Sequence, residues 1–189
     1  MPGGCLRAYL ESLGHSRHTI FATGLIDAQG RDQMWGTITF PLPETASLYG
    51  RHLDPLAGRH RFLARSKGGL YGWKQASSYP ELIVVEGLFD LASLWQAGFA
   101  HAVALLGCHF NRQQQAQIAD GRSRTIYLCL DADANGRGQG AARLWCERMR
   151  RRGQRVAPVR LPDGCDPNRF FAEGGCAAGF SRYLEEADQ

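Results

Sequence analysis

Short apolar runs alternate with amphipathic stretches along the second half of the chain. The first run, ELIVVEG at 81–87, is almost continuously apolar, as is typical of a parallel strand covered on both faces. A stretch with helical spacing follows it and ends at Gly98, after which the pattern repeats. The pattern predicts strands at 81–87, 101–107, 125–133 and 154–162, and helices at 88–98, 111–120 and 139–153. Such alternation over short loops predicts an α/β domain with a Rossmann-like parallel sheet of about four strands and flanking helices.

The first 80 residues lack this alternation. Their pattern predicts a short helix at 8–16, extended chain with a turn at Gln29-Gly30 over 24–43, a strand at 46–54, and a basic loop that runs into a helix over 60–76. The Ser/Pro-containing turn SSYPE precedes the first buried strand. We therefore expect a smaller α+β subdomain at 1–80, the sheet domain at 81–172 and a helical tail at 173–189.

Composition narrows the class of protein. The chain of 189 residues is 44% hydrophobic, which is ample for a core, and no apolar stretch approaches the ~20 residues of a membrane span. The first residues lack the apolar region of a signal peptide, so we expect a cytoplasmic protein with no membrane partner. The six cysteines include no CxxC pair, which argues against a zinc ribbon or a disulfide framework.

Acidic residues follow three of the four predicted strands. Glu86 ends the first and Asp90 lies one helical turn later; Asp131 and Asp133 end the third, where alternation would point both side chains the same way; Asp166 follows the fourth. The carboxyl ends of parallel strands share one edge of the sheet, which is where ligands bind. Clustered carboxylates suit a hard cation such as Mg²⁺ or Mn²⁺ and are the usual apparatus of phosphoryl transfer.

Each acid also has an ordinary structural explanation. A single acid after a strand is more often a helix N-cap or a turn former, and Asp163-Gly164 and Asp166-Pro167 are common turn sequences. Capping explains the joint placement of all five acids much less easily, and this placement favours a metal site.

Positive charge is concentrated at the beginning of the chain. Residues 1–80 hold nine Lys and Arg against five Asp and Glu, and the remainder holds thirteen of each. Arg51, Arg65 and Lys67 are candidates to contact phosphates of nucleic acid, the last two in the glycine-containing stretch RHRFLARSKGG. The alternatives are that this stretch is merely solvated, or that RMRRRGQR at 148–155 binds nucleic acid instead.

Three stretches of the second half resemble a known family. VVEGLFD, LCLDADANGRGQGAARL and LPDGCDPNRFF resemble the acidic motifs of the TOPRIM domain. Upstream, GTITFPL, LYGRHLD and KGGLYGWKQA resemble, in order, pieces of the catalytic core of bacterial-type (DnaG-like) DNA primases. The resemblance extends over about residues 24–171 and implies a TOPRIM fold preceded by a primase-core N-terminal subdomain.

The resemblance also implies roles for particular residues. Glu86, Asp131 and Asp133 correspond to the acids that hold divalent metal at the polymerisation site, and Asp90 and Asp166 to further acids of the motifs. Gly50-Arg51 and Lys67-Gly68 correspond to pieces that face nucleotide and template. The implied activity is that of a nucleotidyltransferase, the synthesis of short RNA primers from nucleoside triphosphates on single-stranded DNA with Mg²⁺ or Mn²⁺.

The chain departs from the family in several places. Asn168 stands where the family has a second acid after the Asp-Pro motif, and no arginine lies between Asp32 and Phe40, where the family carries an arginine-rich stretch. No Cys/His set has zinc-ligand spacing, and the helicase-binding region is missing. We therefore expect a reduced core that works with a separate zinc-binding or helicase partner.

Two other functions remain open on the residues. A TOPRIM nuclease would use the same fold and metal site to cut nucleic acid, and a catalytically weak nucleic-acid-binding module would use the fold for assembly in a replication or mobile-element complex. The intact acids favour the enzyme. A topoisomerase is less favoured, because its nucleophilic tyrosine requires a large additional domain.

Overall fold

A computed structural model describes residues 32–42, 45, 47–54, 56, 60–63, 67–131 and 137–188. The chain divides into two compact units, residues 1–68 and residues 69–189, and each is described by itself. Residues 69–80, which were assigned to the expected first subdomain, belong to the second unit. The predicted helix at 8–16, the predicted turn at Gln29-Gly30, Arg65 and Asp133 lie outside the described residues.

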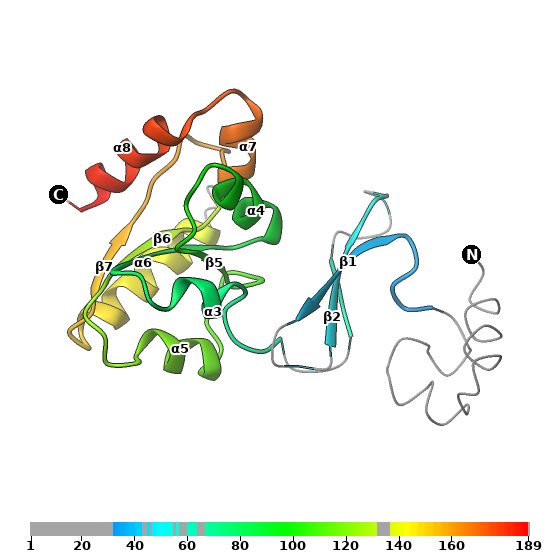
Figure 1. Cartoon of the computed structure of the whole chain (residues 1–189), viewed down its shortest axis with the longest axis horizontal. Coiled ribbons are helices and arrows are strands. Elements are labelled where there is room, and N and C mark those ends of the chain that lie inside the picture. Colours follow the sequence, from blue (N-terminus) through cyan, green and yellow to red (C-terminus); the bar gives the residue numbers. More distant parts are fainter. Residues whose placement is uncertain are drawn as a thin grey trace. The chain divides into compact units, whose positions relative to one another are not determined.

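The first unit contains a three-stranded antiparallel sheet in the order β1-β2-β3. Strand β1 is Thr37–Leu42, β2 is Ser47–His52, within the predicted strand at 46–54, and β3 is His60–Phe62 (Figure 1). The stretch from His60 was expected to be a basic loop, and this expectation is wrong for His60–Phe62. Three residues are too few for an alternating pattern to stand out, and β3 is defined by its pairing with β2, in which Tyr49 lies opposite Phe62.

The second unit contains the predicted parallel sheet, which confirms the fold class. Its strands are β4 (Glu81–Val85), β5 (Ala102–Ala104), β6 (Thr125–Cys129) and β7 (Arg155–Pro158), in the order β5-β4-β6-β7. All three pairings are parallel. Leu82, Ile83 and Val84 are fully buried, as expected of a central strand covered on both faces.

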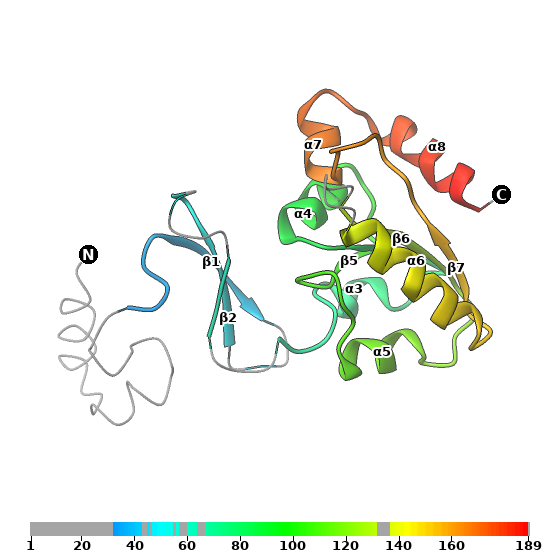
Figure 2. The ribbon, with the colours of Figure 1, turned by 180° about the vertical axis from the view of Figure 1, so that it is seen from behind.

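Helices cover both faces of this sheet. Figures 1 and 2 show α4, α7 and α8 on one side and α3, α5 and α6 on the other. The helices are α3 (Trp73–Ala76), α4 (Leu88–Gln96), α5 (Arg112–Ile118), α6 (Arg137–Arg150), α7 (Pro167–Ala172) and α8 (Ala177–Ala187). The core under α6 includes Leu82, Leu128 and Trp145, with the Phe110 ring 4.8 Å from that of Trp145.

The last helix is part of the same unit. Phe180 of α8 is fully buried, and its ring lies 5.2 Å from that of Phe99 and 5.8 Å from that of Phe170. These contacts hold α7 and α8 against the chain that follows α4, so the predicted helical tail contributes to the core. Within the described residues, none of the helices has the length and apolar character needed to cross a membrane.

Candidate active site at the carboxyl edge of the sheet

Glu86 and Asp131 follow two neighbouring strands. Val85, the last residue of β4, pairs with Cys129, the last residue of β6, so Glu86 comes one residue and Asp131 two residues beyond this paired end. Both are partly buried. The structure therefore brings these two predicted site residues to one edge of the sheet. The regular strand ends at Cys129, earlier than the predicted end at 133, because the chain leaves the ladder before the Asp-x-Asp motif.

The loop after β5 closes against the same edge. The N–H of Gly107 donates to the carbonyl of Glu86 at 3.2 Å. Leu106, which is buried, has a φ of 59°, in the left-handed region that residues with a side chain rarely adopt. Such a conformation persists only where the surroundings impose it, and it is common beside functional sites. Hydrophobic patterning gives no signal for it, and sequence reasoning missed this residue.

Asp90 occupies the first turn of α4 and is buried, with 6% of its surface exposed. Its Oδ2 accepts a hydrogen bond from the N–H of Gly87 at 3.1 Å, and its Oδ1 accepts one from the N–H of Asn168 at 3.1 Å. The carboxylate therefore caps α4 and also joins it to the start of α7. Asp90 therefore has a structural role, which these two hydrogen bonds establish independently of metal binding.

The pKa of Asp90 is shifted by its burial and by neighbouring charges. The pKa of Asp90 is raised to about 7, mainly by burial and in addition by the carboxylates of Asp131 and Asp166, while the two backbone N–H groups oppose the shift. Burial is the larger cause of the shift, and the two neighbouring carboxylates add to it. The structure thus brings Asp90, Asp131 and Asp166 within electrostatic reach of one another.

Asp166 and Asn168 lie at the start of α7. Oδ1 of Asp166 accepts a hydrogen bond from the N–H of Arg169 at 2.6 Å, which is helix N-capping with Pro167 in the first turn. The Asn168 side chain donates through Nδ2 to Oγ of Ser93 on α4 at 2.9 Å. At the position where the resemblance implies an acid, this chain has an amide that ties α7 to α4.

Two cysteines lie beside the acids. Burial raises the pKa of the Cys129 thiol, and Asp90 and Asp131 raise it further. Burial and the neighbouring Asp166 likewise raise the pKa of the Cys165 thiol, which donates to the carbonyl of Asp166 at 3.5 Å. Both thiols stay protonated at neutral pH.

A glycine of α6 touches the backbone of Asp131. A Cβ atom placed on Gly138 would collide with the carbonyl oxygen of Asp131 and would lie 3.0 Å from its nitrogen. Only glycine allows the start of α6 to approach the Asp-x-Asp segment this closely. Sequence reasoning missed Gly138, although the three glycines of the NGRGQG stretch were a usable signal.

The donor chemistry of this edge suits a hard divalent cation, because the side chains are carboxylates and together carry an excess of negative charge. Among the described residues, no three His, Cys, Asp or Glu side chains form a ready-made ion site. Mg²⁺ needs only one or two protein carboxylates and takes its other ligands from water and phosphate. Glu86 and Asp131 are the candidates for these two carboxylates, and Asp133 lies outside the described residues.

In the first unit, Arg51 and Lys67 lie near aromatic side chains of β2 and β3. Nη1 of Arg51 lies 3.2 Å from Nε2 of His60, whose Nδ1 lies 2.8 Å from the hydroxyl of Tyr49. Nζ of Lys67 lies 4.4 Å from the centre of the Phe62 ring, in cation–π geometry. His60 thus helps to position Arg51. The sequence gave no clear signal for this role, because the two residues meet only through the pairing of β2 with β3.

Known proteins are similar to this chain in sequence and in architecture. The family model that matches residues 83–171 is described as Toprim-like. A DNA primase of Pasteurella multocida is 36% identical over 122 residues, which are 63% of this chain and 20% of that protein. A solved DNA primase domain from Pseudomonas aeruginosa is 26% identical with a TM-score of 0.75, over 94% of this chain and 62% of that one. A solved DnaG primase catalytic domain bound to ssDNA is 24% identical with a TM-score of 0.75, over the same shares.

The chain therefore carries a TOPRIM domain of the kind found in DnaG-like DNA primases, which confirms the resemblance. It spans a fifth of the length of the Pasteurella protein and less than two thirds of these solved domains.

Proposed function

We propose that this protein is a DNA primase catalytic core that synthesises short RNA primers on single-stranded DNA. The observation that carries the proposal is the placement of Glu86 and Asp131 after neighbouring strands of a TOPRIM sheet, with Asp90 and Asp166 adding negative charge. The relatives support it, since they are named DNA primases and one solved catalytic domain is bound to ssDNA.

Glu86, Asp131 and Asp133 would hold Mg²⁺ or Mn²⁺, with Asp90 and Asp166 close by. When bound, the divalent ion lowers the pKa of the attacking hydroxyl and neutralises charge on the phosphates. The 3′ oxygen of one ribonucleotide forms a bond to the α-phosphorus of the next, the bond from that phosphorus to the bridging oxygen breaks, and pyrophosphate leaves. Glu86 either binds the ion or takes the hydroxyl proton. Asp90, held by two backbone N–H groups, keeps α4 and α7 in place around the reacting groups.

The first unit supplies the template contacts in this proposal. Arg51, Arg65 and Lys67 bind phosphates of the single strand, with Arg51 held by His60 and Lys67 placed over Phe62. Contacts of this kind depend on salt and only weakly on base sequence. A separate zinc-binding or helicase partner would select where on the template synthesis begins.

The test is incubation of the purified protein with single-stranded DNA, ribonucleoside triphosphates and either Mg²⁺ or Mn²⁺, with synthesis of oligonucleotides and degradation of the template both measured. We expect synthesis that is lost in Glu86→Gln and Asp131→Asn. Glu186→Gln, an exposed substitution on α8, is the matched control and keeps full activity. Degradation of the template without synthesis would identify a nuclease instead, and neither activity would favour a binding module.

A further inference from the structure

A pocket rich in arginine lies at the opposite, amino edge of the parallel sheet. It has a volume of about 360 Å³ and is lined by the end of α5, the segment 121–124 and the turn after α6. Four of its residues are arginines: Arg122, Arg124, Arg152 and Arg155. Arg124 directly precedes β6, and Arg155 begins β7 and pairs with Thr125. At about 3.3 Å per residue, the seven residues from Arg124 to Asp131 place this pocket roughly 20 Å from the acidic edge.

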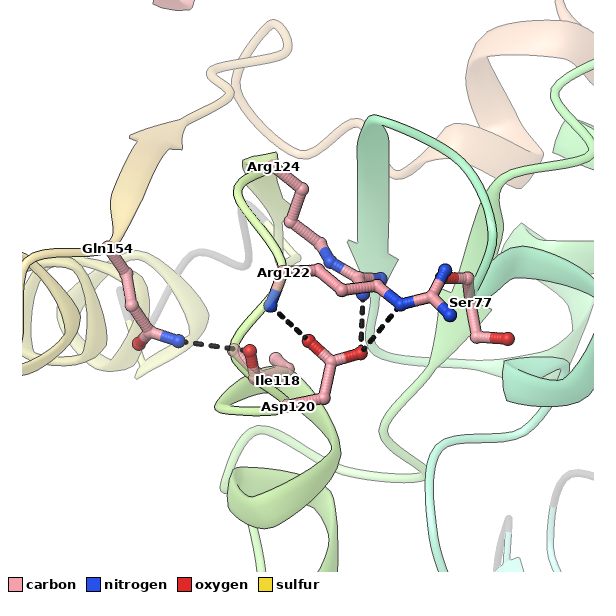
Figure 3. A network of polar contacts seen from close by, with 6 residues as sticks. All are labelled: Ser77, Ile118, Asp120, Arg122, Arg124 and Gln154. Atoms are coloured by element: carbon pink, nitrogen blue, oxygen red, sulfur yellow. Dashed lines mark hydrogen bonds and ion pairs between the residues drawn. The ribbon is translucent and has the colours of Figure 1, made fainter.

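One arginine of the pocket is a buried cation. The side chain of Arg124 is 1% exposed, and its Nη2 lies 2.6 Å from Oδ2 of Asp120 (Figure 3). Its guanidinium carbon lies 5.1 Å from the centre of the Trp73 ring. Its Nε and Nη1 are buried and have no hydrogen-bond partner in the described part of the chain. Arginine does not lose its proton in a protein, so Arg124 places a permanent positive charge at this edge, paired with Asp120.

The other three arginines remain available to a ligand. The Arg122 side chain is 63% exposed, with Nε 4.0 Å from Asp120, and it donates to the carbonyl of Ser77 at 3.4 Å. The Arg155 side chain is 69% exposed and lies 4.0 Å from Asp188. Arg152 is exposed. Exposed ion pairs at this distance contribute little, so these cations can be drawn to a more highly charged partner.

A hydrogen bond between two segments of the chain stabilises the walls of the pocket. Nε2 of Gln154 donates to the carbonyl of Ile118 at 3.1 Å, which ties the turn after α6 to the end of α5 (Figure 3). Gly121 and Gly153 have φ of +82° and +76°, and a Cβ atom on either would meet nothing within 4 Å. The two turns therefore expose bare backbone, which a bound group can approach closely.

We propose that this arginine pocket binds a phosphate group, either of a nucleic-acid backbone or of a free nucleotide. Arg152 and Arg155 make the contacts, and Arg122 and Arg124 add positive potential. The guanidinium group suits phosphate because its N–H donors match two phosphate oxygens at once. The site is separate from the acidic edge and from Arg51 and Lys67, and it goes beyond the function proposed above.

The test uses the full chain without metal ions or nucleoside triphosphates, so that a failure of primer synthesis does not affect it. Binding of a fluorescent single-stranded oligothymidylate of about 20 nucleotides is measured by anisotropy between about 50 and 300 mM NaCl. Arg152→Gln with Arg155→Gln should weaken binding about 3- to 10-fold at ~100 mM salt and reduce the salt slope by about 0.7 to 1.4, as expected for one or two lost phosphate contacts. Arg182→Gln, an exposed substitution on α8, is the control and should change neither.

A second arm distinguishes the source of the phosphate. Inorganic tripolyphosphate is added at millimolar concentration, and the thermal midpoint of unfolding is compared between the wild type and the double variant. Weaker oligonucleotide binding by the variant supports a nucleic-acid backbone. A tripolyphosphate-induced shift that the variant loses, with oligonucleotide binding unchanged, supports a free nucleotide. If the variant matches the wild type in both arms, the proposal is wrong.

Discussion

At the scale of single residues, the acidic edge combines catalytic candidates with groups that are needed to build the fold. Asp90 and Asp166 both cap helices, as the ordinary explanation of an acid after a strand anticipates, and both also share a negative field with Asp131. Capping and the proposed metal binding would use the same carboxylates, and substitutions can separate the two roles.

Asp131→Asn should leave the protein at least as stable as the wild type in EDTA and abolish primer synthesis. The substitution removes a negative charge that raises the pKa of Asp90, so it relieves repulsion, and it also removes a candidate metal ligand. Thermal unfolding in EDTA and the primer assay measure the two effects. A marked loss of stability without metal would instead show that the Asp131 carboxylate holds the fold together.

The stability of the metal-free protein should depend on the titration of Asp90. Its pKa is about 7 in the folded state against 3.8 for the ordinary group, so the folded state binds the proton more tightly. The contribution of Asp90 to stability is therefore greatest near pH 4 and falls as the pH rises from about 4 to about 7. The upper limit is about 1.4 kcal/mol per pH unit. Urea unfolding in EDTA at several pH values should show this fall, and Asp90→Asn should flatten it. An equal slope in the variant would assign the effect to other groups.

At the scale of elements, two glycines of α6 form a matched pair. Gly138→Ala drives a methyl group into the backbone of Asp131, whereas Gly140→Ala meets nothing within 4 Å. We expect Gly140→Ala to stabilise the protein by about 0.5–1 kcal/mol, since alanine is the better helix former. Gly138→Ala should destabilise it by about 1–3 kcal/mol, as overpacking does, and should lower primer synthesis as well. Urea unfolding measures the stability of both variants, and the primer assay measures their activity. Equal stabilities would contradict the close contact between Gly138 and the backbone of Asp131.

Patterning predicted the four strands of the parallel sheet and the helices α4, α5 and α6. The prediction was clearest for β4 and β6, because these strands are buried on both faces and show continuous apolar runs. Patterning also placed Glu86 and Asp131 at the strand ends, because both residues come immediately after these apolar runs in the sequence. It did not predict β3, whose three residues are defined by pairing with β2. It also missed Leu106 and Gly138, because positive φ and close backbone approach leave no mark on hydrophobic periodicity.

At the scale of the whole molecule, charge differs between the two parts of the chain. The excess of positive charge lies in residues 1–80, and residues 81–189 hold thirteen Lys and Arg against thirteen Asp and Glu. A nucleic acid that reached the acidic edge without basic contacts would be repelled by the carboxylates there. In the proposed function, template binding therefore comes from arginines and lysines.

The first unit should supply most of the affinity for single-stranded DNA if the proposed template contacts are correct. Arg51→Gln with Lys67→Gln removes two cations that His60 and Phe62 position, so binding should weaken and the salt slope should fall by about 1.4, or about 0.7 for each lost contact. His60→Ala should weaken binding less, because it frees the Arg51 side chain without removing its charge. Anisotropy titrations at several salt concentrations measure these effects. The substitutions of Arg51 and Lys67 could leave DNA binding unchanged, while those of Arg152 and Arg155 remove the whole salt dependence. Template binding would then belong to the second unit, and its assignment to the first unit would be wrong.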